Sequence, residues 1–124
     1  MLVDMQVVRY ITVFATLLMM VAGCAQEKPA AILGTRPSDA APVHIASLTK
    51  SKQPQTISGT MIDKCPVAGC WFHVKDSTGV IKVDTKNSGF VVTDVPINSH
   101  VTVTGLMRGG DDDQTLTASG MSYR

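Results

Sequence analysis

The chain has little net charge and few aromatic side chains. Its 124 residues carry a formal charge of +1, from 11 Lys and Arg against 10 Asp and Glu, and only 5% of them are Phe, Trp or Tyr. Proteins that bind phosphate backbones without sequence preference need a basic surface, and those that bind single strands also use aromatic platforms. The composition therefore disfavours non-specific nucleic-acid binding, and it supplies no field that would steer acidic substrates.

No catalytic constellation is evident either. His44 and His100 are isolated, with no serine or carboxylate at a telling spacing. The run Asp111 to Asp113 lacks the spaced carboxylates and the glutamate of an EF-hand loop, so it is interpreted as a solvated hairpin tip. The sequence thus predicts a protein that is not an enzyme and that needs no cofactor.

A hydrophobic run near the N-terminus is too short to cross a membrane. Residues 10–22 (YITVFATLLMMVA) are uncharged, follow Arg9 and number 13, whereas a transmembrane helix needs about 20 apolar residues. Small residues then lead to Cys24. This is the anatomy of an export signal, which predicts a signal peptide over residues 1–23.

The end of that run, Val21-Ala22-Gly23-Cys24, resembles the lipobox of bacterial lipoproteins. The resemblance implies cleavage before Cys24 and lipidation of its sulfur. Two or three acyl chains anchor a protein durably, whereas one chain binds only marginally. No aspartate follows Cys24, and in lipoproteins with that retention rule its absence implies the outer membrane. We therefore expect a lipid-anchored protein of the cell envelope, in the outer membrane and facing the periplasm.

Residues 24–53 are predicted to be the lipidated N-terminus and a flexible tether. The stretch AQEKPAAILGTRPSDAAP is rich in Ala, Pro and small polar residues and has no apolar periodicity. Such a composition buries too little apolar surface to offset the entropy lost on ordering. The segment 43–50 (VHIASLTK) fits either a short helix or a strand, and 51–55 is interpreted as a turn.

Residues 54–124 show the pattern of strands, with alternating or β-branched runs separated by Gly, Asp and Asn. Turn signals occur at 76–79 (DSTG) and 109–113 (GGDDD). Five short strands, with a wider gap between the third and the fourth, is the order of an OB-fold. We predict an all-β domain, a single five-stranded OB-fold barrel, with strands at Thr56–Asp63, Trp71–Lys75, Val80–Thr85, His100–Met107 and Thr115–Met121.

The segments ISGTMID, CWFHVKDSTGVIKVD, VTVTGLM and TLTASGM resemble OB-fold domains of the transfer-RNA anticodon-binding and helicase type. The segment CPVAGCW (65–71), with Gly89-Phe90 further on, is also similar to small exported bacterial proteins of unknown function that share this barrel. The resemblance implies the fold over 54–124. It implies an oligonucleotide ligand only by analogy, which the neutral charge and the predicted export disfavour.

Cys65 and Cys70 form the first candidate site. Outside the cytoplasm two nearby thiols are usually oxidised, and a disulfide closing so short a loop contributes about 2 kcal/mol to stability. A second interpretation is a copper or zinc site formed by Cys65, Cys70 and His73; a third is a redox-active pair. The spacing C-x₄-C is not the usual one for a zinc knuckle or a thioredoxin-type pair, so the disulfide is favoured. Thioether ligands for copper could come from Met61, Met107 and Met121.

The second candidate site is the outer face of the barrel. Alternation in WFHVK (71–75) directs Phe72 and Val74 inward and the other three side chains outward. In OB-folds the outer face of the second and third strands carries ligands. The alternative is that Trp71 packs against residues 89–90 while the lysines are merely solvated. The predicted ligand-binding residues are Trp71, His73, Lys75 and Lys82.

Three hypotheses of function follow. The first is a membrane-anchored, non-enzymatic OB-fold binding module whose ligand is a protein, a glycan or an oligonucleotide. The alternative is a periplasmic metal-binding protein that uses Cys65, Cys70 and His73. An enzyme or redox protein ranks last.

Overall fold

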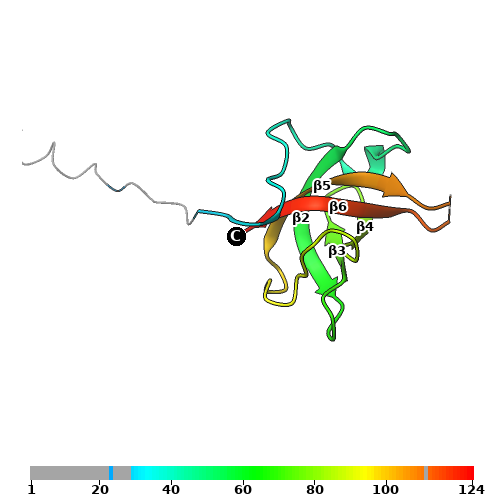
Figure 1. The fold of residues 1–124 in the computed structure, drawn as a ribbon. Helices are drawn as coiled ribbons and strands as arrows, with labels where there is room; N and C mark the ends of the chain where they lie inside the picture. The colour runs from blue at the N-terminus through cyan, green and yellow to red at the C-terminus, as the bar shows by residue number, and fades with distance from the viewer. Residues whose placement is uncertain (1–22, 24–28, 111) are drawn as a thin grey trace, which may run out of the picture.

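Six strands and one short 3-10 helix are the secondary-structure elements of the described residues. The computed structural model describes residues 23, 29–110 and 112–124 (Figure 1). In this described part there is no α-helix, and nothing helical is long and apolar enough to cross a membrane. The elements are β1 (Ala31–Gly34), η2 (Ile45–Ser47), β2 (Gln55–Lys64), β3 (Trp71–Lys75), β4 (Val80–Asp84), β5 (His100–Arg108) and β6 (Thr115–Tyr123).

The sheet closes into a five-stranded barrel. Its strand order is β1-β6-β4-β3-β2-β5, and a further pairing of β5 with β6 completes the ring, leaving β1 outside it on β6. All neighbours are antiparallel except β4 and β6, which run parallel. The all-β OB-fold barrel predicted from the sequence is confirmed. The five predicted strands match β2 to β6, with each end within two residues of the observed one.

The barrel interior is apolar because alternate residues of every barrel strand point into it. Each fully buried aliphatic or aromatic side chain stabilises the fold by about 1.5–3 kcal/mol. The three methionines considered as metal ligands belong to this core: Met61 and Met121 are fully buried and Met107 nearly so. The largest completely buried side chains are Phe72, Ile57, Met61, Leu116, Met121, Val74, Val83, Val92, Val95, Val101 and Val103.

Strand β2 contains a bulge that changes which residues face each other. The register shifts between Met61 and Asp63, so that Met61 pairs with Val74 but Asp63 pairs with His73. Ile62 is the extra residue, and it is 39% exposed. A bulge of this kind re-aims the side chains that follow it. Here it sets Asp63 directly opposite His73.

The sequence predicts a flexible tether up to residue 53, whereas the structure binds part of this segment to the barrel. Strand β1 pairs with β6, from Ala31 opposite Tyr123 to Gly34 opposite Gly120. At both glycines the space of a Cβ is already occupied, by the Phe90 ring at Gly34 and by backbone of Thr35 at Gly120. The close pairing of the two backbones stabilises the position of β1. A search for periodic apolar residues does not detect such pairing.

A second part of the same segment reaches the core. Ile45, in η2, is 7% exposed and belongs to the hydrophobic cluster of the barrel, with Leu48 packed against it at the margin. The predicted signal peptide, Cys24 and the first residues of the predicted tether, up to 28, lie outside the described residues except for Gly23.

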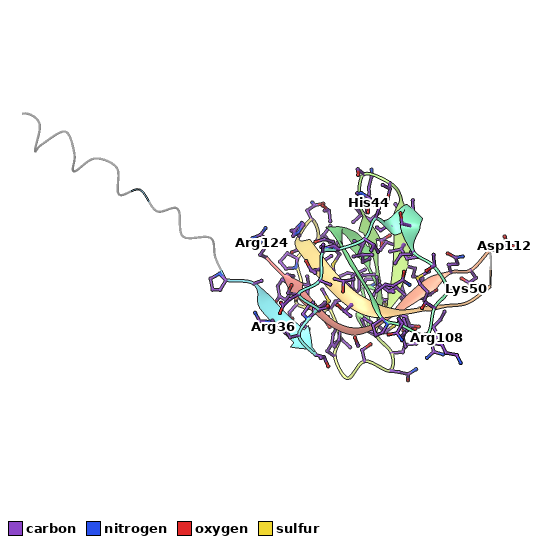
Figure 2. The ribbon with its side chains drawn as sticks, turned by 90° about the horizontal axis from the view of Figure 1, so that it is seen from above. Arg36, His44, Lys50, Arg108, Asp112 and Arg124 are labelled. Carbon is purple, nitrogen blue, oxygen red and sulfur yellow. The ribbon has the colours of Figure 1, made fainter. Side chains whose placement is uncertain are left out.

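Both described ends of the chain lie at one end of the barrel. Ala31 opposes Tyr123, so the chain enters β1 beside the point where β6 leaves the sheet (Figure 1). Figure 2 shows Arg36 and Arg124 on this side and Asp112, in the β5–β6 connection, at the opposite side.

The turn between β3 and β4 is closed by Asp76, whose Oδ1 accepts hydrogen bonds from Thr78 N (2.7 Å) and Gly79 N (3.0 Å).

Candidate ligand-binding face

The side chains of β3 alternate between the core and the outer surface. Phe72 and Val74 are completely buried, while Trp71 and His73 are half-buried and Lys75 is exposed. This is the orientation that alternation predicts. On the neighbouring strand β4, Lys82 is exposed and lies opposite His73, and Asp84 lies opposite Trp71.

Trp71 contacts two of the other predicted ligand-binding residues, His73 and Lys82. The rings of Trp71 and His73 meet edge to face, with centroids 5.4 Å apart and an interplanar angle of 72°. The ammonium group of Lys82 lies over the Trp71 ring, 5.5 Å from its centroid. Lys75 lies on the same face of β3 but further along, opposite Val80 at the start of the turn. We call Trp71, His73 and Lys82 the outer-face cluster.

The rings of Trp71 and Phe90, which the alternative interpretation brings together, each have neighbours elsewhere. Phe90 is packed at the margin of the core, where its ring fills the space above Gly34. Trp71 instead has its ring partners on β3 and β4.

Asp63 is a member of this face that sequence reasoning missed. Its Oδ1 lies 2.6 Å from His73 Nδ1. Their side chains are 54% and 32% exposed, so the pair contributes little to stability. Its effect is on orientation, because a partner at Nδ1 fixes the imidazole ring and selects which nitrogen carries the proton. Only the bulge at Ile62 brings the two residues into register, and simple alternation does not reveal a bulge.

The structure does not gather the predicted metal ligands. Among the described residues, no three His, Cys, Asp or Glu side chains are placed to hold a metal ion. His73 is bonded to Asp63 rather than turned to the cysteines. The methionines considered for copper are buried in the core.

Cys65 and Cys70 are free thiols in the structure, so the predicted disulfide between them is not formed here. Both are half-buried, at the two ends of the loop from β2 to β3. Hydrogen bonding from the loop backbone, foremost at Ala68, and from the Cys70 side chain favours the thiolate form of Cys65. These hydrogen bonds outweigh desolvation and lower the pKa of Cys65 to about 7.

Neither a family model nor a curated protein sequence matches this chain. Among solved structures, the barrel is similar to that of the hypothetical protein YgiW from E. coli, with a TM-score of 0.53. The match covers 73% of this chain and 98% of that one, at 14% sequence identity. The likeness shows the fold. At this identity it assigns no role to any residue, so the site must be argued from its own geometry.

Proposed function

We propose that this protein is a non-enzymatic binding module, held at the cell envelope by lipid on Cys24, whose outer-face cluster contacts the ligand. The observation that carries the proposal is the gathering of an aromatic ring, an imidazole and an ammonium group on the exposed side of β3 and β4. In OB-folds the outer face of the corresponding strands is where ligands are contacted. Neither this cluster nor Asp63 beside it forms a set that points to catalysis.

A ligand can take the place of Lys82 on the tryptophan ring at little cost. The contact of an exposed ammonium group with an aromatic ring is worth about 0.5–1 kcal/mol. A flat ring that stacks on an aromatic side chain contributes about 1–3 kcal/mol. A stacked ligand ring is therefore more favourable on Trp71 than the Lys82 ammonium group is. The displaced Lys82 then becomes available to an anionic group on the same ligand.

These properties define the ligand by its chemistry. It presents a ring face that packs on Trp71, a hydrogen-bonding group for His73 and a negative charge for Lys82. Anionic glycans and oligonucleotides both carry this combination, and a protein can supply it through an aromatic residue beside a carboxylate. The neutral charge of the chain favours the glycan, because it offers no extended basic path for a phosphate backbone.

Titration of the purified protein with a uronate-containing oligosaccharide and, separately, with oligothymidylate tests the proposal through Trp71 fluorescence and calorimetry. We expect the oligosaccharide to bind and Trp71→Ala to weaken its binding by about 1–3 kcal/mol, which is roughly 5- to 150-fold. Lys82→Ala should also weaken binding, whereas Lys52→Ala, an exposed lysine away from the cluster, should not.

If the protein prefers oligothymidylate, the ligand class is an oligonucleotide rather than a glycan, and the outer-face cluster remains the proposed binding site. Binding that is unchanged in both Trp71→Ala and Lys82→Ala would contradict the proposal itself. Circular dichroism of each variant serves as the control for folding, since Trp71 lies outside the buried core.

A further inference from the structure

The loop that carries Cys65 and Cys70 is fixed at both ends. Cys65 N donates to Trp71 O (3.0 Å), Gly69 N donates to Cys65 O (3.3 Å), and Thr85 N donates to Cys70 O (2.9 Å). Gly69 has a φ of +58°, in the left-handed region that favours glycine. The two thiols therefore occupy defined positions rather than the ends of a mobile loop.

A second segment braces this loop from outside. Gly69 O accepts hydrogen bonds from Val92 N (3.0 Å) and from Thr85 Oγ1 (3.2 Å). The ammonium group of Lys64, the residue before Cys65, donates to the carbonyls of residues 93 (2.7 Å) and 95 (2.5 Å). Residues 92–95 are thus tied to both sides of the cysteine loop.

The two cysteines are not equivalent. The loop backbone, foremost at Ala68, and the neighbouring Cys70 side chain stabilise a thiolate at Cys65. Cys70 lies at the other end of the same short loop, and the two sulfurs are not bonded to each other. A thiolate with a second thiol beside it is the arrangement of an attacking and a resolving cysteine.

A pocket of about 440 Å³ opens beside Cys70. Phe90 lies in its wall, half-buried, and Val91 is 52% exposed at its edge. Val67, at the tip of the cysteine loop, is 87% exposed. Apolar side chains around a reactive thiol pair form a binding site for an apolar residue of another polypeptide. The lining residues are Ala68, Cys70, Thr85, Lys86, Phe90 and Val91, with Gly89.

We propose that Cys65 and Cys70 are a redox-active dithiol that exchanges with a disulfide of a polypeptide substrate, an apolar residue of which occupies the pocket beside Cys70. This activity is independent of ligand binding at the outer-face cluster. It accounts for a short, fixed loop that carries two thiols and opens beside one of them onto a pocket with apolar walls.

The exchange proceeds in two substitutions at sulfur. The Cys65 thiolate attacks the substrate S–S bond, forming a mixed disulfide on Cys65 and releasing one substrate thiolate. Cys70, on losing its proton to that thiolate, attacks the Cys65 sulfur and releases the second. The pair ends as a Cys65–Cys70 disulfide, and the substrate disulfide has gained two electrons and the Cys70 proton. The second substrate thiolate takes its proton from water, which had received the proton of Cys65. The reverse sequence oxidises a substrate dithiol, and stabilising the thiolate favours that direction.

The first experiment uses the full chain carrying Cys24→Ser, which removes the third thiol, and oxidised glutathione as the probe. Reduced protein should form a Cys65–Cys70 disulfide that dithiothreitol reverses. Adding Cys70→Ser should trap one glutathione on Cys65, detected by mass. With Cys65→Ser instead, Cys70 should take up glutathione about tenfold more slowly than Cys65 does in the Cys70→Ser variant, because Cys65 is the attacking sulfur.

The second experiment tests the pocket with a disulfide-linked peptide pair that carries an apolar residue next to its cysteine. Val91→Ala should slow exchange with this peptide about tenfold but leave exchange with oxidised glutathione unchanged. Val80→Ala is the matched control, since Val80 is similarly exposed, at 48%, on β4 and does not line the pocket.

Three results would overturn the proposal. One is a Cys70→Ser variant that folds but accumulates no glutathione. Another is a Cys65–Cys70 bond that persists in reducing glutathione buffers, which makes it structural. The third is that the two thiols retain close to one equivalent of copper or zinc and that the bound metal protects them from reaction with oxidised glutathione.

Discussion

The carboxylate of Asp76 holds the backbone of Ile45, with Asp76 Oδ2 accepting a hydrogen bond from Ile45 N at 2.8 Å. Thr78 Oγ1, in the same turn, accepts another from Ala46 N at 3.1 Å. The β3–β4 turn thus clamps η2 onto the barrel, and Ile45 enters the core at this point. Desolvation raises the pKa of Asp76, but hydrogen bonds from the Thr78 side chain and from Ile45, Thr78 and Gly79 backbone together lower it to about 2.

This clamp predicts an acid dependence of stability. The folded pKa of Asp76 is below its unfolded value of about 4, so its contribution is fully present above pH 4 and is lost as the pH falls towards 2. Asp76→Asn should flatten the pH dependence of the free energy of unfolding within this window. Urea unfolding at several pH values measures it. An Asn variant with the wild-type slope between pH 4 and 2 would contradict the assignment.

Ile45 should matter to the core although it lies in a segment of tether-like composition. Truncation of a buried isoleucine leaves a cavity and costs about 2–4 kcal/mol. We expect this loss for Ile45→Ala in the free energy of unfolding. Val43→Ala, at a residue 39% exposed, should change it by less than about 0.5 kcal/mol. Equal effects of the two substitutions would show that Ile45 does not pack in the barrel.

The pairing of β1 with β6 can be tested at Gly120. A Cβ there would overlap backbone atoms of Thr35, so Gly120→Ala should push β1 away from the sheet. We expect faster amide exchange at the β1 residues and a loss of about 1–3 kcal/mol in stability. Gly110→Ala is the matched control, because a Cβ at Gly110 meets no atom within 4 Å. Unchanged exchange in Gly120→Ala would mean that β1 is not docked.

The proposed lipid anchor rests on the lipobox-like sequence before Cys24. Cys24→Ser should abolish incorporation of labelled fatty acid and move the protein out of the membrane fraction. Lipid labelling followed by fractionation measures both. If the wild-type chain takes up no label, the anchor is absent, and the outer-face cluster must be considered without it.

The barrel strands could be predicted because their side chains alternate between one apolar and one polar face, as in Phe72 and His73. The two docked parts of the N-terminal segment could not. Strand β1 is joined to β6 by backbone hydrogen bonds, and most of its side chains stay exposed. Ile45 is a single anchor whose partner, Asp76, is 31 residues away in the chain. Neither β1 nor Ile45 therefore gives a periodic hydrophobic pattern in the sequence.

The candidate site shows the same limit. The outward direction of Trp71 and His73 follows from their spacing, whereas the pairing of His73 with Asp63 depends on an extra residue in β2. The cysteines could be recognised as a pair. That the loop backbone stabilises a thiolate at Cys65 is a property of the loop path, which the residue types alone do not specify.

The docking of β1 changes how far the barrel can travel from its proposed anchor. If the chain were free up to Gln55, the segment from Cys24 could extend to about 100 Å, at 3.3–3.6 Å per residue. With Ala31 already on the sheet, only six residues separate it from Cys24, and the seven Cα–Cα steps between them span about 25 Å at most. The proposed lipid would therefore confine the barrel to the immediate vicinity of the bilayer, so its partners must themselves lie at or come to the membrane surface.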